Sequence, residues 1–153
     1  MSGLATSTTK SKPAALRAYA SLRFLGNRLE PERISAIFGA EPTTAYRIGE
    51  VFKQSRGHEV RGRTGLWLLS TRGRIDSTDL EVHFAYLLGV LFPGGAKKVA
   101  ESVRALMAED GLEADVGCFW YGEHGAKLPA IPDAIHAAFA EIGAVVEPDF
   151  HTD

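Results

Sequence analysis

The sequence has little cysteine and no long hydrophobic run. Cys118 is the one cysteine among 153 residues, so the sequence offers neither an intrachain disulfide nor a zinc cluster built on several cysteine ligands. No window approaches the roughly 18 consecutive apolar residues of a membrane-spanning helix. The first residues also lack the apolar stretch of about 7 to 15 residues found in secretory signals. These absences predict a cytoplasmic protein with no membrane segment.

The rest of the composition is typical of a folded protein. Hydrophobic residues make up 45% of the chain and charged residues 24%, which argues against a fibrous or wholly disordered protein. The exception is the N-terminal segment MSGLATSTTKSKP, which is rich in Ser, Thr and Lys and contains one leucine. Such a segment buries too little apolar surface to offset its ordering entropy. We predict a disordered tail over residues 1–13 and a single α+β domain over residues 14–153.

Regular patterns after the tail predict alternating strands and helices. Over residues 19–26 apolar side chains alternate with other residues, as in a strand with one face on a core. Pro31 suits the first turn of a helix that runs to Phe38 and ends at Gly39. By the same kinds of pattern we expect strands over residues 43–48, 64–71, 114–122 and 144–150, and helices over residues 78–92, 97–109 and 132–142.

This order of elements predicts the fold class. It is compatible with an α+β fold, either a ferredoxin-like sandwich of helices on a mainly antiparallel sheet or a related arrangement with another connectivity. Thr78 and Glu81 match a reciprocal capping pattern at the start of the second helix. Pro148 predicts that the last strand lies at a sheet edge, and the apolar run over residues 114–122 predicts a largely buried strand that includes Cys118.

The residue types that commonly carry chemistry do not form a recognisable site. The five histidines are scattered over different predicted elements, whereas zinc sites need ligands at short, regular spacings. His83 and His136 lie off the apolar stripes of their helices, so we expect both at the surface or at the boundary of the core. The stretches GHEVRGRTG and PGGAKK lack the glycine spacing of phosphate-binding and dinucleotide-binding loops, and no nucleophile motif is present. We predict no catalytic residue, no cofactor and no metal, which favours a protein that is not an enzyme.

Charge is distributed unevenly along the chain. Residues 1–74 contain 13 Lys/Arg and 5 Glu, a balance of +8, whereas residues 75–153 contain 4 Lys/Arg and 14 Asp/Glu, a balance of −10. Such a split indicates either a face that binds nucleic acid or two halves that attract each other within the fold.

The most basic stretch, residues 47–74, is the best candidate for a binding surface. It contains several cations separated by glycines, with Tyr46, Phe52 and Trp67 as possible stacking groups for bases. The sequence pI of about 6.2 and the absence of a known recognition motif argue against nucleic acid. The predicted surface consists of Arg47, Lys53, Arg56, Arg61, Arg63 and Trp67.

A set of short motifs occurs in a fixed order along the chain. These motifs are a strand, a proline at a helix start, a glycine followed by Pro-Thr and a further glycine, and a Gly-x-Trp strand. They fall on Pro31, Gly39, Pro42, Thr43, Gly49, Gly65 and Trp67. In this order the chain resembles the bacterial family known as domain of unknown function 4279, over about residues 18–152. The resemblance implies a stand-alone cytoplasmic bacterial domain without an assigned activity.

Three functions remain open from the sequence. The lack of a catalytic signature and the strong charge split favour a non-catalytic module that binds a protein partner or a second copy of itself. By analogy with other small α+β bacterial families, such a module would act as an immunity protein that binds a toxin. Binding of nucleic acid or another anionic ligand through residues 47–74 is the first alternative, and an enzyme of unknown class is the second.

Overall fold

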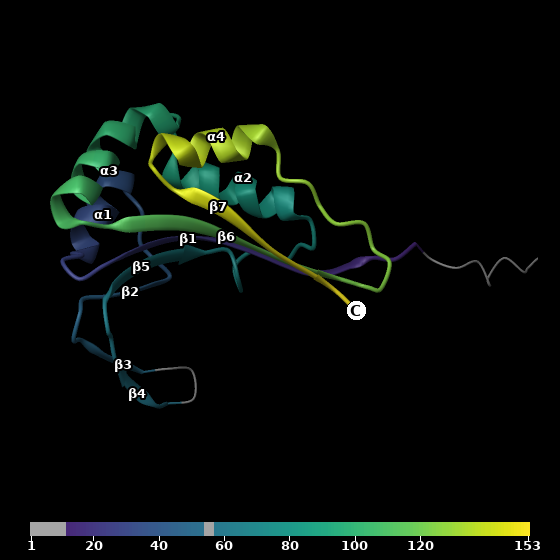
Figure 1. Cartoon of the computed structure of the whole chain (residues 1–153), viewed down its shortest axis with the longest axis horizontal. Coiled ribbons are helices and arrows are strands. Elements are labelled where there is room, and N and C mark those ends of the chain that lie inside the picture. Colours follow the sequence, from purple (N-terminus) through teal and green to yellow (C-terminus); the bar gives the residue numbers. More distant parts are fainter. Residues whose placement is uncertain (1–11, 54–56) are drawn as a thin grey trace, which may run out of the picture.

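A computed structural model of the chain describes residues 12–53 and 57–153 (Figure 1). The predicted tail up to residue 11, and Arg56 of the predicted binding surface, lie outside the described residues. In chain order the elements are β1 (Ala15–Gly26), α1 (Pro31–Phe38), β2 (Thr44–Tyr46), β3 (Val51–Lys53), β4 (Glu59–Arg61), β5 (Gly65–Ser70), α2 (Leu80–Leu91), α3 (Ala96–Asp110), β6 (Glu113–Gly122), α4 (Asp133–Glu141) and β7 (Val145–Thr152).

The main sheet has five strands in the order β2-β5-β1-β6-β7. All neighbours are antiparallel except β6 and β7, which are parallel. The first four strands reproduce the strand order of a ferredoxin-like sheet, and the α4–β7 unit adds one parallel strand at the β6 edge. The predicted α+β fold is therefore confirmed, as is the edge position of Pro148 on β7. Strands β3 and β4 form a separate two-stranded hairpin between β2 and β5.

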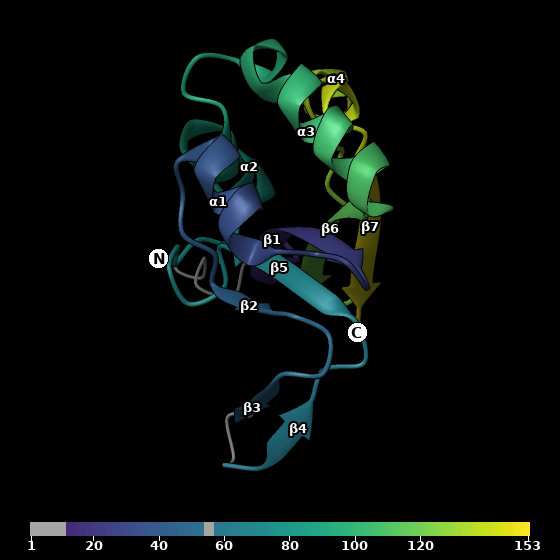
Figure 2. The ribbon, with the colours of Figure 1, turned by 90° about the vertical axis from the view of Figure 1, so that its left-hand side faces the viewer.

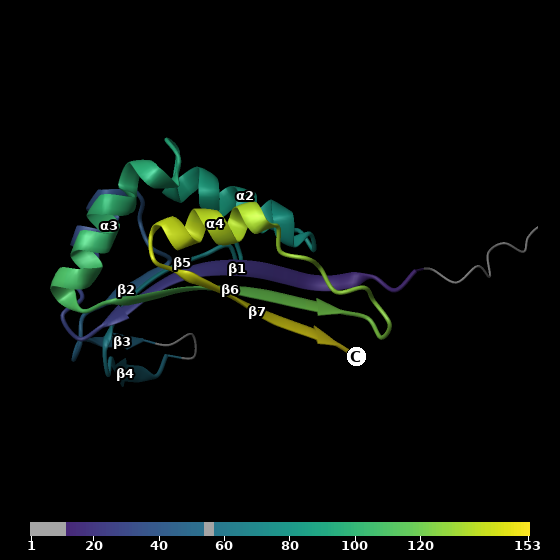
Figure 3. The same ribbon diagram turned by 45° about the horizontal axis from the view of Figure 1, so that its top comes forward.

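The four helices cover one face of the sheet and leave the other face uncovered. Figures 2 and 3 show α1 to α4 on one side of the main sheet. The β3–β4 hairpin projects on the opposite side, away from the helices. The molecule therefore has a helix-covered face, an uncovered sheet face, and a hairpin that stands beside the uncovered face.

The core lies between the sheet and the helices. Ala20, Leu22 and Phe24, at alternate positions of β1, are at most 1% exposed, as the predicted period of two requires. Trp67 on β5 is fully buried among them, with its ring centroid 5.9 Å from that of Phe24 and 5.8 Å from that of Phe38. The indole Nε1 donates a hydrogen bond to Ser35 Oγ on α1 at 3.0 Å, which ties the first helix to the sheet.

Several element boundaries differ from the sequence patterns for physical reasons. Helix α1 matches its prediction, with Pro31 in the first turn and Gly39 in a left-handed conformation at φ 64°. The predicted Thr78 cap of α2 is wrong, because Asp79 is the N-cap and its side chain accepts a hydrogen bond from Glu81 N at 2.9 Å. Strand β1 begins four residues before the predicted start, because its first residues pair with the far end of β6, where Ala15 lies opposite Gly122.

Candidate functional site

Part of the charge split is used within the fold. Arg33 on α1 pairs with Glu109 at 3.1 Å and with Asp110 at 3.4 Å, and Arg28 lies 3.8 Å from Asp110. On the uncovered sheet face, the side-chain hydrogen bond to Asp115 raises the pKa of Arg23. These contacts join the basic half of the chain to the acidic half and support the second reading of the charge split. Within the described part of the chain, five arginines of the basic half make no ion pair: Arg17, Arg61, Arg63, Arg72 and Arg74.

The structure divides the predicted binding surface into two parts. Arg47 is half-buried and pairs with Glu32 of α1 at 2.6 Å, and Arg61 donates to the Gly49 carbonyl at 2.7 Å at the base of the hairpin. Lys53 and Arg63 are exposed. Trp67 does not join them, because its side of β5 faces the helices. The prediction of Trp67 as a surface stacking group is therefore wrong.

Exposed arginines and aromatic rings meet instead on the uncovered sheet face. Tyr19 of β1 lies directly opposite Phe119 of β6, with ring centroids 4.9 Å apart and an interplanar angle of 15°. The Arg17 guanidinium lies 5.7 Å from the Tyr19 centroid and 5.9 Å from the Phe119 centroid. The Arg72 guanidinium lies 5.2 Å from the Tyr19 centroid. We call Arg17, Tyr19, Arg72 and Phe119 the arginine–aromatic cluster.

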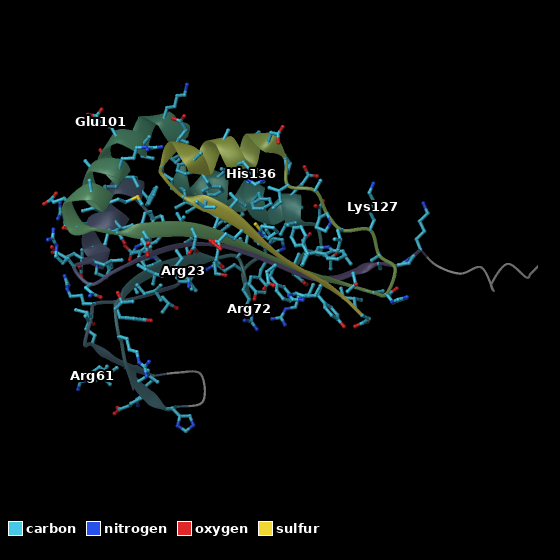
Figure 4. The ribbon with its side chains drawn as sticks, viewed as in Figure 1. Arg23, Arg61, Arg72, Glu101, Lys127 and His136 are labelled. Atoms are coloured by element: carbon cyan, nitrogen blue, oxygen red, sulfur yellow. The ribbon has the colours of Figure 1, made fainter. Side chains whose placement is uncertain are left out.

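Local structure explains how each member of the cluster reaches this face. Arg17 and Tyr19 occupy alternate positions of β1, so both point away from the buried Ala18 and Ala20. Arg72 follows the end of β5, where its backbone N–H donates to Ser70 Oγ at 3.1 Å. Figure 4 shows Arg72 on the side of the sheet opposite the helices. The two rings are half-buried, and both arginines are exposed.

A hollow of about 380 Å³ adjoins the cluster. It is formed by β1 residues 16–19 and by the turn over residues 72–78, so Arg17, Arg72 and Arg74 line it together with one carboxylate, Asp76. A volume of this size lies within the range of small-ligand sites. Three guanidinium groups against one carboxylate favour an anion there.

The turn that carries Arg72 is held by a buried histidine. His83 is 0% exposed, so the prediction of a surface or boundary position is wrong for this residue, whereas His136 is exposed as expected. His83 Nε2 lies 2.7 Å from the Ser77 carbonyl, which can only accept, so Nε2 carries the proton. Nδ1 lies 2.7 Å from Thr71 Oγ1, which accepts from Ala20 N at 2.9 Å and also lies 3.3 Å from the Ala20 carbonyl. This network fixes both ends of the turn against α2 and β1.

Other reactive groups are either buried or dispersed. Burial raises the pKa of Cys118 to about 12, so the thiol stays protonated at neutral pH, and the predicted buried position of this residue is confirmed. Over residues 12–53 and 57–153, no three side chains of His, Cys, Asp or Glu lie close enough together to hold a metal ion. None of the helices in the described ranges has the length and apolar character needed to cross a membrane.

Sequence patterns alone missed three members of the cluster. Tyr19 and Arg17 belong to the polar face of a strand whose alternation was evident, which was the usable signal. Phe119 was hidden because the whole 114–122 run was expected to be largely buried. In the structure β6 is covered on one side only, with Cys118 at 0% exposed and Phe119 half-buried on the other face.

Comparison with known families gives one match, which covers almost the whole chain. Residues 16–153 match the family described as Domain of unknown function (DUF4279), so the chain belongs to that family. This confirms the resemblance seen in the order of the sequence motifs. No curated protein and no solved structure matches the chain significantly.

Proposed function

We propose that this member of the DUF4279 family is a non-catalytic binding module. Its arginine–aromatic cluster holds an anionic ligand that carries flat rings, which is the chemistry of nucleotides and of single-stranded nucleic acid. The observation that supports the proposal is the position of Arg17 and Arg72. Both guanidinium groups lie over half-buried rings beside a hollow, and neither has a carboxylate partner within the described residues.

The two parts of such a ligand match the two parts of the cluster. A guanidinium group offers planar, paired N–H donors that fit phosphate oxygens, and it also stacks on aromatic planes. Tyr19 and Phe119 present a ring surface on which a base stacks, and base–aromatic stacking is worth about 1–3 kcal/mol per base. When a base stacks on the rings, Arg17 and Arg72 are already within reach of its phosphate.

A protein partner is the second candidate, and a different surface supports it. Ile48 is 47% exposed and Val51 is 52% exposed, and both lie at the base of the hairpin near Lys53, which makes no ion pair within the described residues. Apolar side chains next to free cations suit an acidic protein surface. An immunity-like role, in which the partner is a toxin, is one form of this candidate.

The proposal is tested by fluorescence anisotropy with a labelled single-stranded RNA of about 12 nucleotides at low salt, with adenosine monophosphate as a competitor. Phe119→Ala and Arg72→Gln each remove one part of the cluster. Lys97→Gln is the matched control, since it removes one positive charge from α3 on the helix-covered side.

We expect each cluster variant to lower the affinity about tenfold, which corresponds to about 1.4 kcal/mol. The control should stay within about twofold of the wild-type protein, a change of about 0.4 kcal/mol. Equal affinities for all four proteins, or no binding by the wild-type protein, would contradict the proposal.

A further inference from the structure

We infer that the ligand of the arginine–aromatic cluster is a single-stranded nucleic acid of several nucleotides, which lies along β5 and reaches the β3–β4 hairpin. This inference rests on the proposed function and names its ligand class. It is carried by the position of the hairpin relative to the uncovered sheet face and by the distribution of charge across that face.

The hairpin and the cluster lie on the same side of the sheet. Figures 1 and 2 show the hairpin projecting away from the helices, on the side where the sheet is uncovered. Figure 4 shows Arg61 on the hairpin and Arg72 beyond the far end of β5. The uncovered sheet face and the hairpin therefore adjoin at an angle and together form one solvent-accessible surface.

Cations are available at both ends of this surface. Lys53 of β3 and Arg63, which follows β4, are exposed and make no ion pair in the described part of the chain. Arg72 supplies a guanidinium group without an ion-pair partner in the described ranges at the other end, whereas Arg74 donates a hydrogen bond to Tyr86 of α2 at 3.4 Å. Strand β5 has six residues, so it separates the two ends by roughly 20 Å. A mononucleotide is too short to contact both ends, whereas a chain of several phosphates can.

The surface between the two ends suits unpaired bases. Leu66 and Leu68 of β5 and Leu25 of β1 point to the uncovered face and are half-buried. They form an apolar floor at the hairpin end of the face, and the hydrogen-bonded Ser21 and Ser70 lie between this floor and the Tyr19 ring. A double helix hides the faces of its bases, so only a single strand can place bases on such a floor and on the rings.

Acidic residues at one edge of the sheet indicate which edge the nucleic acid avoids. Glu147 and Asp149 of β7 are exposed on the uncovered face, at the edge opposite β2 and β5. They border a hollow of about 460 Å³ that also includes the Arg23–Asp115 pair and reaches Leu68 of β5. Phosphates are repelled from this edge, so the basic path along β5 is the favourable one.

The experiment measures the salt dependence of RNA binding by anisotropy, between about 50 and 200 mM salt. The test protein carries Lys53→Gln and Arg63→Gln, and the matched control carries Lys97→Gln and Lys98→Gln on α3. The logarithm of the binding constant falls as log salt rises, and each lost phosphate contact makes this slope less steep by about 0.7 for a single-stranded nucleic acid. We expect the hairpin variant to have a slope less steep by about 1.4, because it loses two phosphate contacts. The slope of the control should not change, and adenosine monophosphate should compete equally well with RNA for both variants.

Two further arms separate the possible outcomes. A fully paired duplex of the same sequence should bind more weakly than the single strand, and equal or tighter duplex binding would overturn the inference. If Phe119→Ala weakens RNA binding but the hairpin variant keeps the wild-type slope, this inference fails and the proposed function stands. If Phe119→Ala also binds as the wild-type protein does, the proposed function itself fails.

Discussion

The two faces of the main sheet each contain a group of aromatic residues, and the two groups differ in what surrounds them. On the covered face Phe24, Phe38 and Trp67 pack among helices and are at most 5% exposed. On the uncovered face Tyr19 and Phe119 stack on each other, with arginines beside both rings and the His151 ring 5.8 Å from Phe119. The first group is enclosed by apolar atoms, and the second is open to solvent and to a ligand.

This difference separates stability from binding. Rings in a close-packed core contribute through buried area and packing, so their removal leaves cavities. Rings that are half-exposed on a sheet face contribute far less to stability and remain available for stacking. Removing an aromatic ring from the covered face should therefore lower mainly the stability, whereas removing one from the uncovered face should lower mainly the affinity for the ligand. Substitutions on the two faces test this contrast.

The largest effect is expected from Trp67→Ala. The substitution leaves a cavity in the core and removes the hydrogen bond to Ser35, so it should lower the free energy of unfolding by about 3–5 kcal/mol. Urea denaturation followed by circular dichroism measures this loss. Trp67→Phe, which keeps a ring, should lose clearly less. A loss below about 1 kcal/mol for the alanine variant would place Trp67 outside the core and would remove the contrast between the faces.

The next effect is expected from Thr71→Val, which preserves shape but removes the hydroxyl. Ala20 N–H and His83 Nδ1 would each lose a buried partner, at a cost of about 1–3 kcal/mol. The measurement is again urea denaturation. Thr78→Val, at an exposed position of the same turn, is the matched control and should change stability by less than about 0.5 kcal/mol. Equal effects of the two variants would show that the buried network does not hold the turn.

A smaller stability effect with a larger binding effect is expected from the Tyr19→Ala, Phe119→Ala double variant. Loss of the stacked pair should cost about 0.5–1.5 kcal/mol beyond the lost area, while RNA affinity should fall more than for either single variant. Denaturation and anisotropy on the same preparation measure both quantities. A stability loss as large as that of Trp67→Ala, with unchanged affinity, would reverse the assignment of the two faces.

The smallest effect concerns Cys118, the neighbour of Phe119 on the covered face. Its pKa is raised in the folded state, so the folded protein keeps a proton that the unfolded chain releases. Its contribution to stability is complete below about pH 9 and decreases as the pH rises from about 9 toward 12. Between pH 7 and 9 this loss should stay below about 0.5 kcal/mol.

A thiol reagent provides the corresponding measurement. In the native protein Cys118 should react slowly between pH 7 and 9. Gly117→Cys, which adds a thiol on the uncovered face where a Cβ meets no atom within 4 Å, should react rapidly. Rapid native labelling of Cys118 would show that its face of β6 is not sealed by the helices.

The fold could be anticipated where the pattern is local. The period of two in β1, the proline and glycine at the ends of α1, and the proline in β7 each report on neighbouring residues in the chain. Trp67 was misplaced because β5 is apolar at consecutive positions, so alternation could not show which side faces the helices. His83 was misplaced because Thr71 and the turn over residues 72–78 fold over it, which the stripe of its own helix does not reveal.

The candidate site could be anticipated only in part. The basic character of residues 47–74 pointed to Lys53 and Arg63, and to Arg72 as part of the same stretch. The cluster itself combines residues from β1, from the end of β5 and from β6, so its members are about one hundred positions apart in the chain. Only the strand order β5-β1-β6 brings them together, and strand order depends on long-range pairing that no local pattern encodes.

The most direct test of the central claim is a nuclear magnetic resonance titration, in which the amide shifts of the labelled protein are followed as single-stranded RNA is added. The account predicts that the largest shifts fall on β1, on residues 70–74 and on β6 around Phe119, with further shifts at the hairpin. Shifts confined to the helices, or no shifts at saturating RNA, would contradict the assignment of the uncovered sheet face as the binding surface.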